Sequence, residues 1–182
     1  MSGHMDGEQA NSPPAEPSAF AAGLGRRSGQ PGAGASEPTG AAVDRAFGPD
    51  DLRDLRRVVA AVASRWGAVP DRVDALKLIV GELTANAVRY AAGRGRLRVW
   101  RRGGQIHCEV SDSGPGFRDP QRVGLHRPAP MSLGGRGIWL VRALADEVTI
   151  EGGRSGAIVT ARIRLGAPVS TLWKQHAAAP GF

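Results

Sequence analysis

The stretch of sequence that decides the fold is GELTANAVRY, residues 81–90. It ends a longer segment in which apolar residues recur every three or four positions, a pattern that predicts a helix with one buried face. Glu82, Asn86 and Arg89 are spaced four and then three residues apart, so they share a face beside that apolar stripe. An acid and an amide one turn apart can act as a general base and a metal ligand. An ordinary solvated helix face would show the same spacing.

A second informative stretch is VSDSGPG, residues 110–116, in which an alternating strand pattern runs into a turn. Asp112 has the same parity as Ile106, Cys108 and Val110, so its carboxylate is predicted to point inward at the end of the strand. An inward carboxylate needs hydrogen-bond donors, and the exocyclic amino group of adenine is one. Gly114 and Gly116 would let a flat base approach the backbone. The alternative is a plain Pro-Gly turn.

The third stretch is GGRG, residues 134–137, immediately before a predicted helix. Glycines at a helix start expose backbone N–H groups at the positive end of the helix dipole, which favours phosphate binding. Gly135, Arg136 and Gly137 are therefore candidate phosphate-binding residues, although glycines before helices also serve simple turns.

The remaining pattern predicts a strand at 42–47, a helix from Asp50 to about Trp66, and a hairpin of strands at 96–102 and 105–111. A third helix at 138–146 and a final hairpin at 148–151 and 157–165 follow. This order indicates an α+β fold, a two-layer sandwich of a mostly antiparallel mixed sheet with three helices on one face.

Composition limits the domain organisation. Residues 1–40 are rich in Gly, Ala, Pro and Ser, which predicts a disordered tail, and residues 166–182 are predicted to be a flexible C-terminal tail. One folded domain, residues 41–165, remains. The single cysteine excludes an intrachain disulfide, and no apolar run approaches the roughly 20 residues that a membrane span needs. A cytoplasmic protein without membrane association is expected.

The net charge of +7 comes almost entirely from arginine, with Lys77 and Lys174 as the two lysines. The arginines are spread along the chain without an aromatic-rich strand or helix-turn-helix spacing, so direct nucleic-acid binding is disfavoured. An acidic protein partner fits the charge equally well. On the first helix, Arg53, Arg56 and Arg57 lie off the apolar stripe and are candidate partner-binding residues, although solvent exposure alone explains them too.

Taken together, the three stretches resemble the N box (residues 82–89), the G1 box (112–116) and the G2 box (135–141) of the GHKL, or Bergerat-fold, ATPases. The residues in the three boxes and the length of the chain are similar to those of the single-domain anti-sigma factor serine/threonine kinases of the actinobacterial type. The resemblance covers roughly residues 41–165 and implies the histidine-kinase-like ATPase fold. Tyr90 departs from the family by standing where His is common, and Arg142 by standing where an acid often occurs.

The resemblance implies a site for ATP and Mg²⁺. It places Glu82 as the catalytic base, Asn86 as the Mg²⁺ ligand and Asp112 as the group that reads adenine. The ATP-binding set it implies is Asn86, Arg89, Asp112, Gly114, Gly116, Gly135, Arg136 and Gly137. The loop at 117–133 would be the ATP lid.

The implied activity is phosphorylation of a Ser or Thr on an anti-anti-sigma (STAS-domain) protein, combined with sequestration of a sigma factor in a partner switch. The alternative is a non-catalytic nucleotide-binding module that sequesters a protein partner. The sequence leaves open whether two copies of the chain pair as a homodimer.

Overall fold

The structure, a computed structural model, describes residues 41–129, 135–153 and 156–166. The predicted tail at 1–40 and all but the first residue of the predicted tail at 166–182 lie outside the described residues. So do Gly134 and residues 130–133 of the predicted lid.

The centre of the domain is a five-stranded sheet in the order β1-β2-β3-β5-β4. The strands are β1 (Val43–Phe47), β2 (Gly95–Arg102), β3 (Gln105–Asp112), β4 (Glu147–Gly153) and β5 (Gly156–Arg164). All four pairings in the described part of the chain are antiparallel. The predicted α+β class and largely antiparallel sheet are therefore confirmed. β2, β3 and β4 extend the predicted strands by one or two residues at an end, β1 starts one residue later than predicted, and β5 is shifted by one residue toward the N-terminus.

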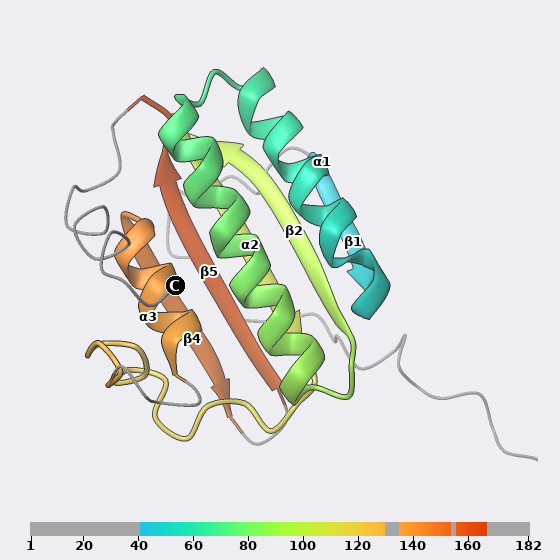
Figure 1. The fold of residues 1–182 in the computed structure, drawn as a ribbon, viewed down its shortest axis with the longest axis vertical. Helices are drawn as coiled ribbons and strands as arrows, with labels where there is room; N and C mark the ends of the chain where they lie inside the picture. The colour runs from blue at the N-terminus through green and yellow to red at the C-terminus, as the bar shows by residue number, and fades with distance from the viewer. Residues whose placement is uncertain (1–40, 130–134, 154–155, 167–182) are drawn as a thin grey trace, which may run out of the picture. The chain divides into compact units, whose positions relative to one another are not determined.

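Three helices cover one face of this sheet: α1 (Leu52–Arg65), α2 (Pro70–Tyr90) and α3 (Arg136–Leu144). A short 3-10 turn, η2 (Pro49–Asp51), leads into α1. Figure 1 shows α2 lying across the middle of the sheet, with α1 on the side of β1 and α3 on the side of β4. The long helix that carries the N-box residues is thus flanked by a helix on each side.

The core forms between the helices and the inward side chains of the strands. In β3, Ile106, Cys108 and Val110 are buried and alternate with partly exposed residues, as the sequence predicts. Burial raises the pKa of the Cys108 thiol to about 12, so this cysteine is a packing residue. The described residues include no helix with the length and apolar character that crossing a bilayer requires.

A charged cluster around Asp146 ties the start of α2 to the loop after α3 and to the end of β5. Arg72 is buried on α2, and its guanidinium donates to the Leu144 carbonyl at 3.3 Å and to the Asp146 carboxylate at 3.0 Å. The same carboxylate accepts bonds from the Arg164 backbone N–H at 2.7 Å and from its guanidinium. The Asp146 carboxylate therefore joins α2 to β5, and Arg72 also joins α2 to the end of α3.

Replacing Asp146 by Ala is expected to lower the free energy of unfolding by about 2 kcal/mol at pH 7, because the buried Arg72 guanidinium would lose its hydrogen bond to this carboxylate. Burial alone would raise the pKa of Asp146, but hydrogen bonds from Arg164 and the charges of Arg72 and Arg164 together lower it. The contribution of the Asp146 cluster to the free energy of unfolding is therefore fully present above the ordinary aspartate pKa. It is lost as the pH falls through the lowered pKa of Asp146.

Urea unfolding at pH 7 and at acid pH measures this effect. The difference between the wild type and Asp146→Ala should shrink as the pH falls. Asp74→Ala is the matched control, because the Asp74 carboxylate is exposed and pairs with Lys77 within one helix turn, a pair worth under about 1 kcal/mol. If the Asp146 variant were as stable as the Asp74 variant at pH 7, the stabilising role assigned to the Asp146 cluster would be wrong.

Candidate functional site

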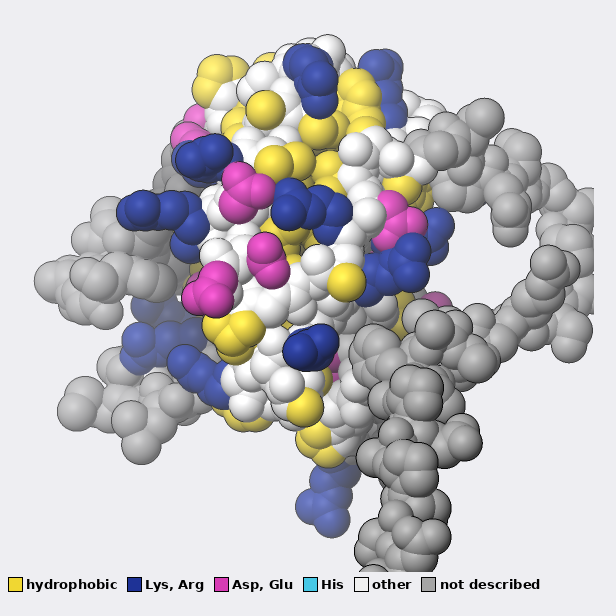
Figure 2. Space-filling view, turned by 90° about the vertical axis from the view of Figure 1, so that its right-hand side faces the viewer, with side chains coloured by type: hydrophobic (Ala, Val, Ile, Leu, Met, Phe, Trp, Pro, Cys, Tyr) yellow, Lys and Arg dark blue, Asp and Glu magenta, His cyan; other side chains and the backbone are white. Residues whose placement is uncertain are grey.

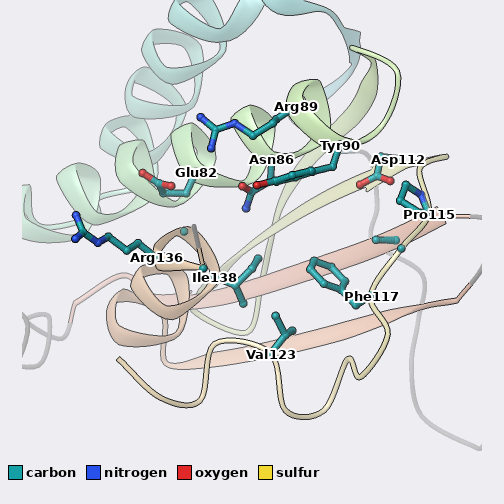
Figure 3. Close-up of a pocket in the computed structure, with 14 residues that line it drawn as sticks. Glu82, Asn86, Arg89, Tyr90, Asp112, Pro115, Phe117, Val123, Arg136 and Ile138 are labelled. Carbon is teal, nitrogen blue, oxygen red and sulfur yellow. The ribbon is translucent and has the colours of Figure 1, made fainter. Parts of the chain in front are cut away.

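A cavity of about 490 Å³ lies between α2, the end of β3 and the start of α3. It is lined by eight of the residues singled out from the sequence, namely Glu82, Asn86, Arg89, Asp112, Gly116, Gly135, Arg136 and Gly137. Figure 3 shows Glu82 and Arg136 at one end of it, Asp112 and Pro115 at the other, and Asn86 between them. The cavity therefore has two chemically different ends.

Glu82 and Asn86 project from α2 into the cavity because their spacing of four places them one above the other on the helix. Within the described residues, neither side chain has a hydrogen-bond or ion-pair partner. Both side chains are only partly exposed. Polar groups in such a position favour a ligand that satisfies them, since partly desolvated polar atoms without partners cost free energy.

The start of α3 faces these two side chains at very short range. A Cβ atom added to Gly137 would lie 2.8 Å from Glu82 Oε2 and 3.0 Å from Asn86 Nδ2. Only a glycine lets the first turn of α3 approach the functional face of α2 this closely. Gly137 therefore fixes the width of the cavity at the Glu82 end.

The N-terminus of α3 supplies positive potential at that same end. Its N-cap is Gly135 with φ +85°, a left-handed conformation that glycine adopts without strain. The helix starts at Arg136, two residues before the predicted start, and Gly135, Arg136 and Gly137 line the cavity. The first N–H groups of a helix have no partner within the helix itself. Such a helix start attracts phosphate groups.

Asp112 marks the other end. Its Oδ1 accepts a hydrogen bond from the Gly114 backbone N–H at 2.9 Å, which fixes the turn after β3 and holds the carboxylate at the cavity edge. The prediction that Asp112 points toward the helix side of the sheet is confirmed by this position. A carboxylate at an otherwise apolar end can accept a hydrogen bond from an amino group on a flat base.

The two G1 glycines have packing roles that the sequence reasoning did not identify. A Cβ on Gly114 would lie 2.8 Å from the Tyr90 carbonyl oxygen, and Gly114 does not line the cavity. A Cβ on Gly116 would overlap the carbonyl oxygens of Gly153 and Gly156. These glycines therefore let the turn pack against the end of α2 and the β4-β5 hairpin. Gly114 was predicted to let a base approach its backbone, but its missing side chain instead makes room for the end of α2.

An apolar wall completes the cavity, and its residues were not among the predicted ATP-binding residues. Pro115, Phe117, Val123, Ile138 and Ala157 line it, together with the exposed ring of Tyr90. In Figure 3, Phe117, Val123 and Ile138 lie on the side opposite α2. Phe117 and Val123 belong to a Pro- and Gly-rich loop without periodicity, so no sequence pattern marks them, whereas Ile138 follows directly from the GRG motif.

The three arginines of α1 lie outside the cavity, on the outer surface. Figure 2 shows the side of the molecule that carries α1 and β1, where basic and acidic side chains are interspersed. Arg57 pairs with Asp54 at 3.4 Å, and Arg45 pairs with the same carboxylate at 3.0 Å. The exposed Arg53 and Arg56 have no acidic partner among the described residues.

The donor set of the cavity fits a magnesium nucleotide better than a metal ion alone. The described residues include no group of three or more His, Cys, Asp or Glu side chains arranged to hold a metal. Asn86 and Glu82 supply oxygen atoms, the donors that Mg²⁺ prefers, and Mg²⁺ is commonly held by one or two side chains together with substrate phosphates.

Comparison with known proteins gives several relatives among bacterial kinases. The chain is 30% identical over 115 residues to the serine-protein kinase RsbW of Bacillus subtilis (strain 168), covering 57% of this chain and 72% of that protein. It is 28% identical over 117 residues to the serine-protein kinase RsbW of Bacillus pumilus, with the same coverage.

Among solved structures, the catalytic domain of the histidine kinase ThkA matches with 14% identity and a TM-score of 0.45, covering 68% of this chain and 96% of that one. A histidine kinase domain from Erythrobacter litoralis EL346 matches with 24% identity and a TM-score of 0.44, covering 73% and 71%. The family model described as "Histidine kinase-like ATPase domain" matches residues 46–163, which is most of the described domain. The chain belongs to the histidine kinase-like ATPase domain family.

Proposed function

We propose that this protein is an ATP-binding, Mg²⁺-dependent protein serine/threonine kinase that phosphorylates an anti-anti-sigma (STAS-domain) partner in the cytoplasm and also sequesters a sigma factor. The observation that carries the proposal is the convergence of Glu82 and Asn86, which have no partner within residues 41–129, 135–153 and 156–166, on the N-terminus of α3. The similarity to serine-protein kinases over most of the domain supports it.

In the proposed bound state, adenine lies at the Asp112 end and the phosphates lie at the Glu82 end. The Asp112 carboxylate accepts a hydrogen bond from the exocyclic amino group of the base, beside the apolar wall formed by Phe117 and Ile138. The backbone N–H groups of Gly135, Arg136 and Gly137 bind phosphate oxygens, and Arg89 adds positive charge. Asn86 would hold Mg²⁺, which neutralises charge on the phosphates when bound.

In the proposed transfer, the hydroxyl oxygen of the acceptor Ser or Thr forms a bond to the γ-phosphorus of ATP. The bond from that phosphorus to the bridging oxygen breaks and ADP leaves, while the hydroxyl proton passes to the Glu82 carboxylate. Glu82 therefore orients the hydroxyl and accepts its proton. The start of α3 stabilises the charge that develops on the transferred group.

For the protein partners, we propose that the exposed arginines of α1 contribute to docking. Arg53 and Arg56 have no acidic partner among the described residues, so both guanidinium groups are available to an acidic surface. The Arg56 stem packs over Gly81, where an added Cβ would lie 3.3 Å from Arg56 Cδ. Arg57 would contribute less because it already pairs with Asp54.

A non-catalytic module that holds a nucleotide and sequesters a protein is the rival proposal. It needs Asp112, the start of α3 and a docking surface, but it gives no role to an acid beside the phosphates. An unpaired carboxylate there would repel an anionic ligand, so Glu82 favours the kinase.

The test is transfer of radiolabelled phosphate from [γ-³²P]ATP to a STAS-domain protein encoded near this gene, with and without Mg²⁺. The kinase proposal predicts a labelled Ser or Thr on the partner, dependent on Mg²⁺. Tight nucleotide binding without any labelled partner across the STAS proteins of the source organism would favour the non-catalytic module instead.

A further inference from the structure

Two residues of the apolar wall of the cavity lie on a stretch of chain that has no helix or strand of its own. Residues 117–129, here called the arm, run from the end of β3 toward α3 and contribute Phe117 and Val123 to the cavity. Both side chains also pack against the core. An irregular segment needs specific contacts to hold two wall residues in place, because fixing each backbone residue costs about 1 kcal/mol or more.

Those contacts are made with α3. Arg142 Nε donates a hydrogen bond to the Val123 carbonyl oxygen at 2.9 Å in a partly buried position. The hydrogen bonds within the arm itself use the carbonyls of Asp119 and Arg122, so the Val123 carbonyl is left for Arg142. The guanidinium carbon of Arg127 also lies 5.7 Å from the centre of the Trp139 ring.

The arm leaves no room for a side chain toward α3 at Gly124. This residue has φ +71°, and a Cβ on it would lie 2.7 Å from Ile138 Cγ2 and 2.8 Å from the Trp139 backbone nitrogen. The backbone of the arm therefore rests directly on the first turns of α3. The contact lies beside Val123, which is the wall residue held by Arg142.

We propose that Arg142 is a positioning residue for nucleotide binding: it clamps the arm to α3 so that the apolar wall and the phosphate-binding start of α3 form one rigid unit. The inference rests on the proposed function. One helix then carries the Gly135–Gly137 turn at its first residues and the clamp two turns later. A nucleotide whose base contacts the wall and whose phosphates contact the start of α3 is held by both parts at once.

The clamp makes a definite kinetic prediction. A hydrogen bond from a charged donor in a partly buried position is strong enough that its loss should change affinity by about tenfold. Arg142 does not line the cavity. Its loss should therefore act by freeing the arm, and the change should fall mainly on the nucleotide dissociation rate.

The experiment measures mant-ATP binding and release by stopped-flow fluorescence in the full-length protein with Mg²⁺. Arg142→Leu removes the donor and should release mant-ATP about tenfold faster, whereas Arg142→Lys keeps the charge and should recover part of the loss. Arg122→Leu is the matched control, because Arg122 lies on the same arm and is largely exposed, with Asp119 4.0 Å away as its partner. Release from Arg122→Leu should match the wild type.

A second variant disturbs the contact between the arm and α3 at a different residue. Gly124→Ala pushes the arm off α3 without changing Arg142, and it should accelerate release in the same direction. Urea unfolding of each variant shows whether the domain remains folded. Wild-type release rates in folded Arg142→Leu would overturn the proposal, as would faster release in Arg122→Leu of the same size.

Amide hydrogen exchange in the nucleotide-free protein tests the role of Arg142 without requiring that the protein bind a nucleotide. If the wild type bound no mant-ATP, the proposed function would fail, and the clamp would still be decided by exchange at residues 119–125. Faster exchange there in Arg142→Leu than in Arg122→Leu supports the clamp. Equal exchange in the two variants overturns it.

Discussion

Replacing Glu82 by Gln is expected to lower the rate of phosphoryl transfer by about 10³-fold, because a neutral amide lacks the basicity to accept the hydroxyl proton. Nucleotide affinity should stay close to the wild-type value or rise. Gln has nearly the same shape as Glu, and the change removes a negative charge from the end of the cavity that we assign to the phosphates. The variant thus separates transfer from binding.

The measurement pairs single-turnover transfer to the partner with calorimetric titration of ATP on the same preparations. Glu147→Gln is the matched control, since Glu147 lies at the start of β4, pairs with Arg162 and does not line the cavity. It should transfer phosphate at the wild-type rate. Transfer by Glu82→Gln within about threefold of the wild type, well short of the 10²-fold or more that a general base contributes, would assign proton removal to another group.

Replacing Gly137 by Ala is expected to reduce transfer by about 10²-fold while leaving the fold intact. The added methyl group would lie 2.8 Å from Glu82 Oε2 and 3.0 Å from Asn86 Nδ2. Both atoms are at the ends of flexible side chains, so they can move aside at little cost to the fold. The displaced groups are the ones that we assign to the reaction, and therefore activity falls while the structure adapts.

Stability distinguishes this effect from simple misfolding. Alanine is a better helix former than glycine by up to about 1 kcal/mol, so Gly137→Ala should unfold at the same urea concentration as the wild type or a higher one. Gly153→Ala is the control, since a Cβ on Gly153 meets no atom within 4 Å. A Gly137→Ala protein with full activity would show that the close approach of α3 to Glu82 is not needed.

The sequence predicted the parts of the site that lie on periodic elements. Glu82, Asn86 and Arg89 could be placed together because helical spacing fixes which side chains share a face, and Asp112 followed from strand parity. The order of strands and helices followed from the change of apolar period between two and about 3.6.

The sequence did not predict features that depend on contacts between distant segments. Arg72 resembles any solvated helix arginine until the fold brings Asp146 against it. Arg142 was noted only as a departure from the family pattern, because its partner is a backbone carbonyl that no side-chain pattern reveals. The packing role of Gly114 depends on the position of the end of α2, which local sequence does not specify.

The proposed kinase activity requires that a nucleotide occupy the cavity between Asp112 and the start of α3. The most direct measurement is calorimetric titration of the wild type and Asp112→Ala with ATP and ADP, with and without Mg²⁺. We expect micromolar binding to the wild type, strengthened for ATP by Mg²⁺, and a large loss in Asp112→Ala because the base loses its hydrogen-bond acceptor. Absence of binding in both proteins, or equal binding in both, would contradict the assignment of this cavity to ATP.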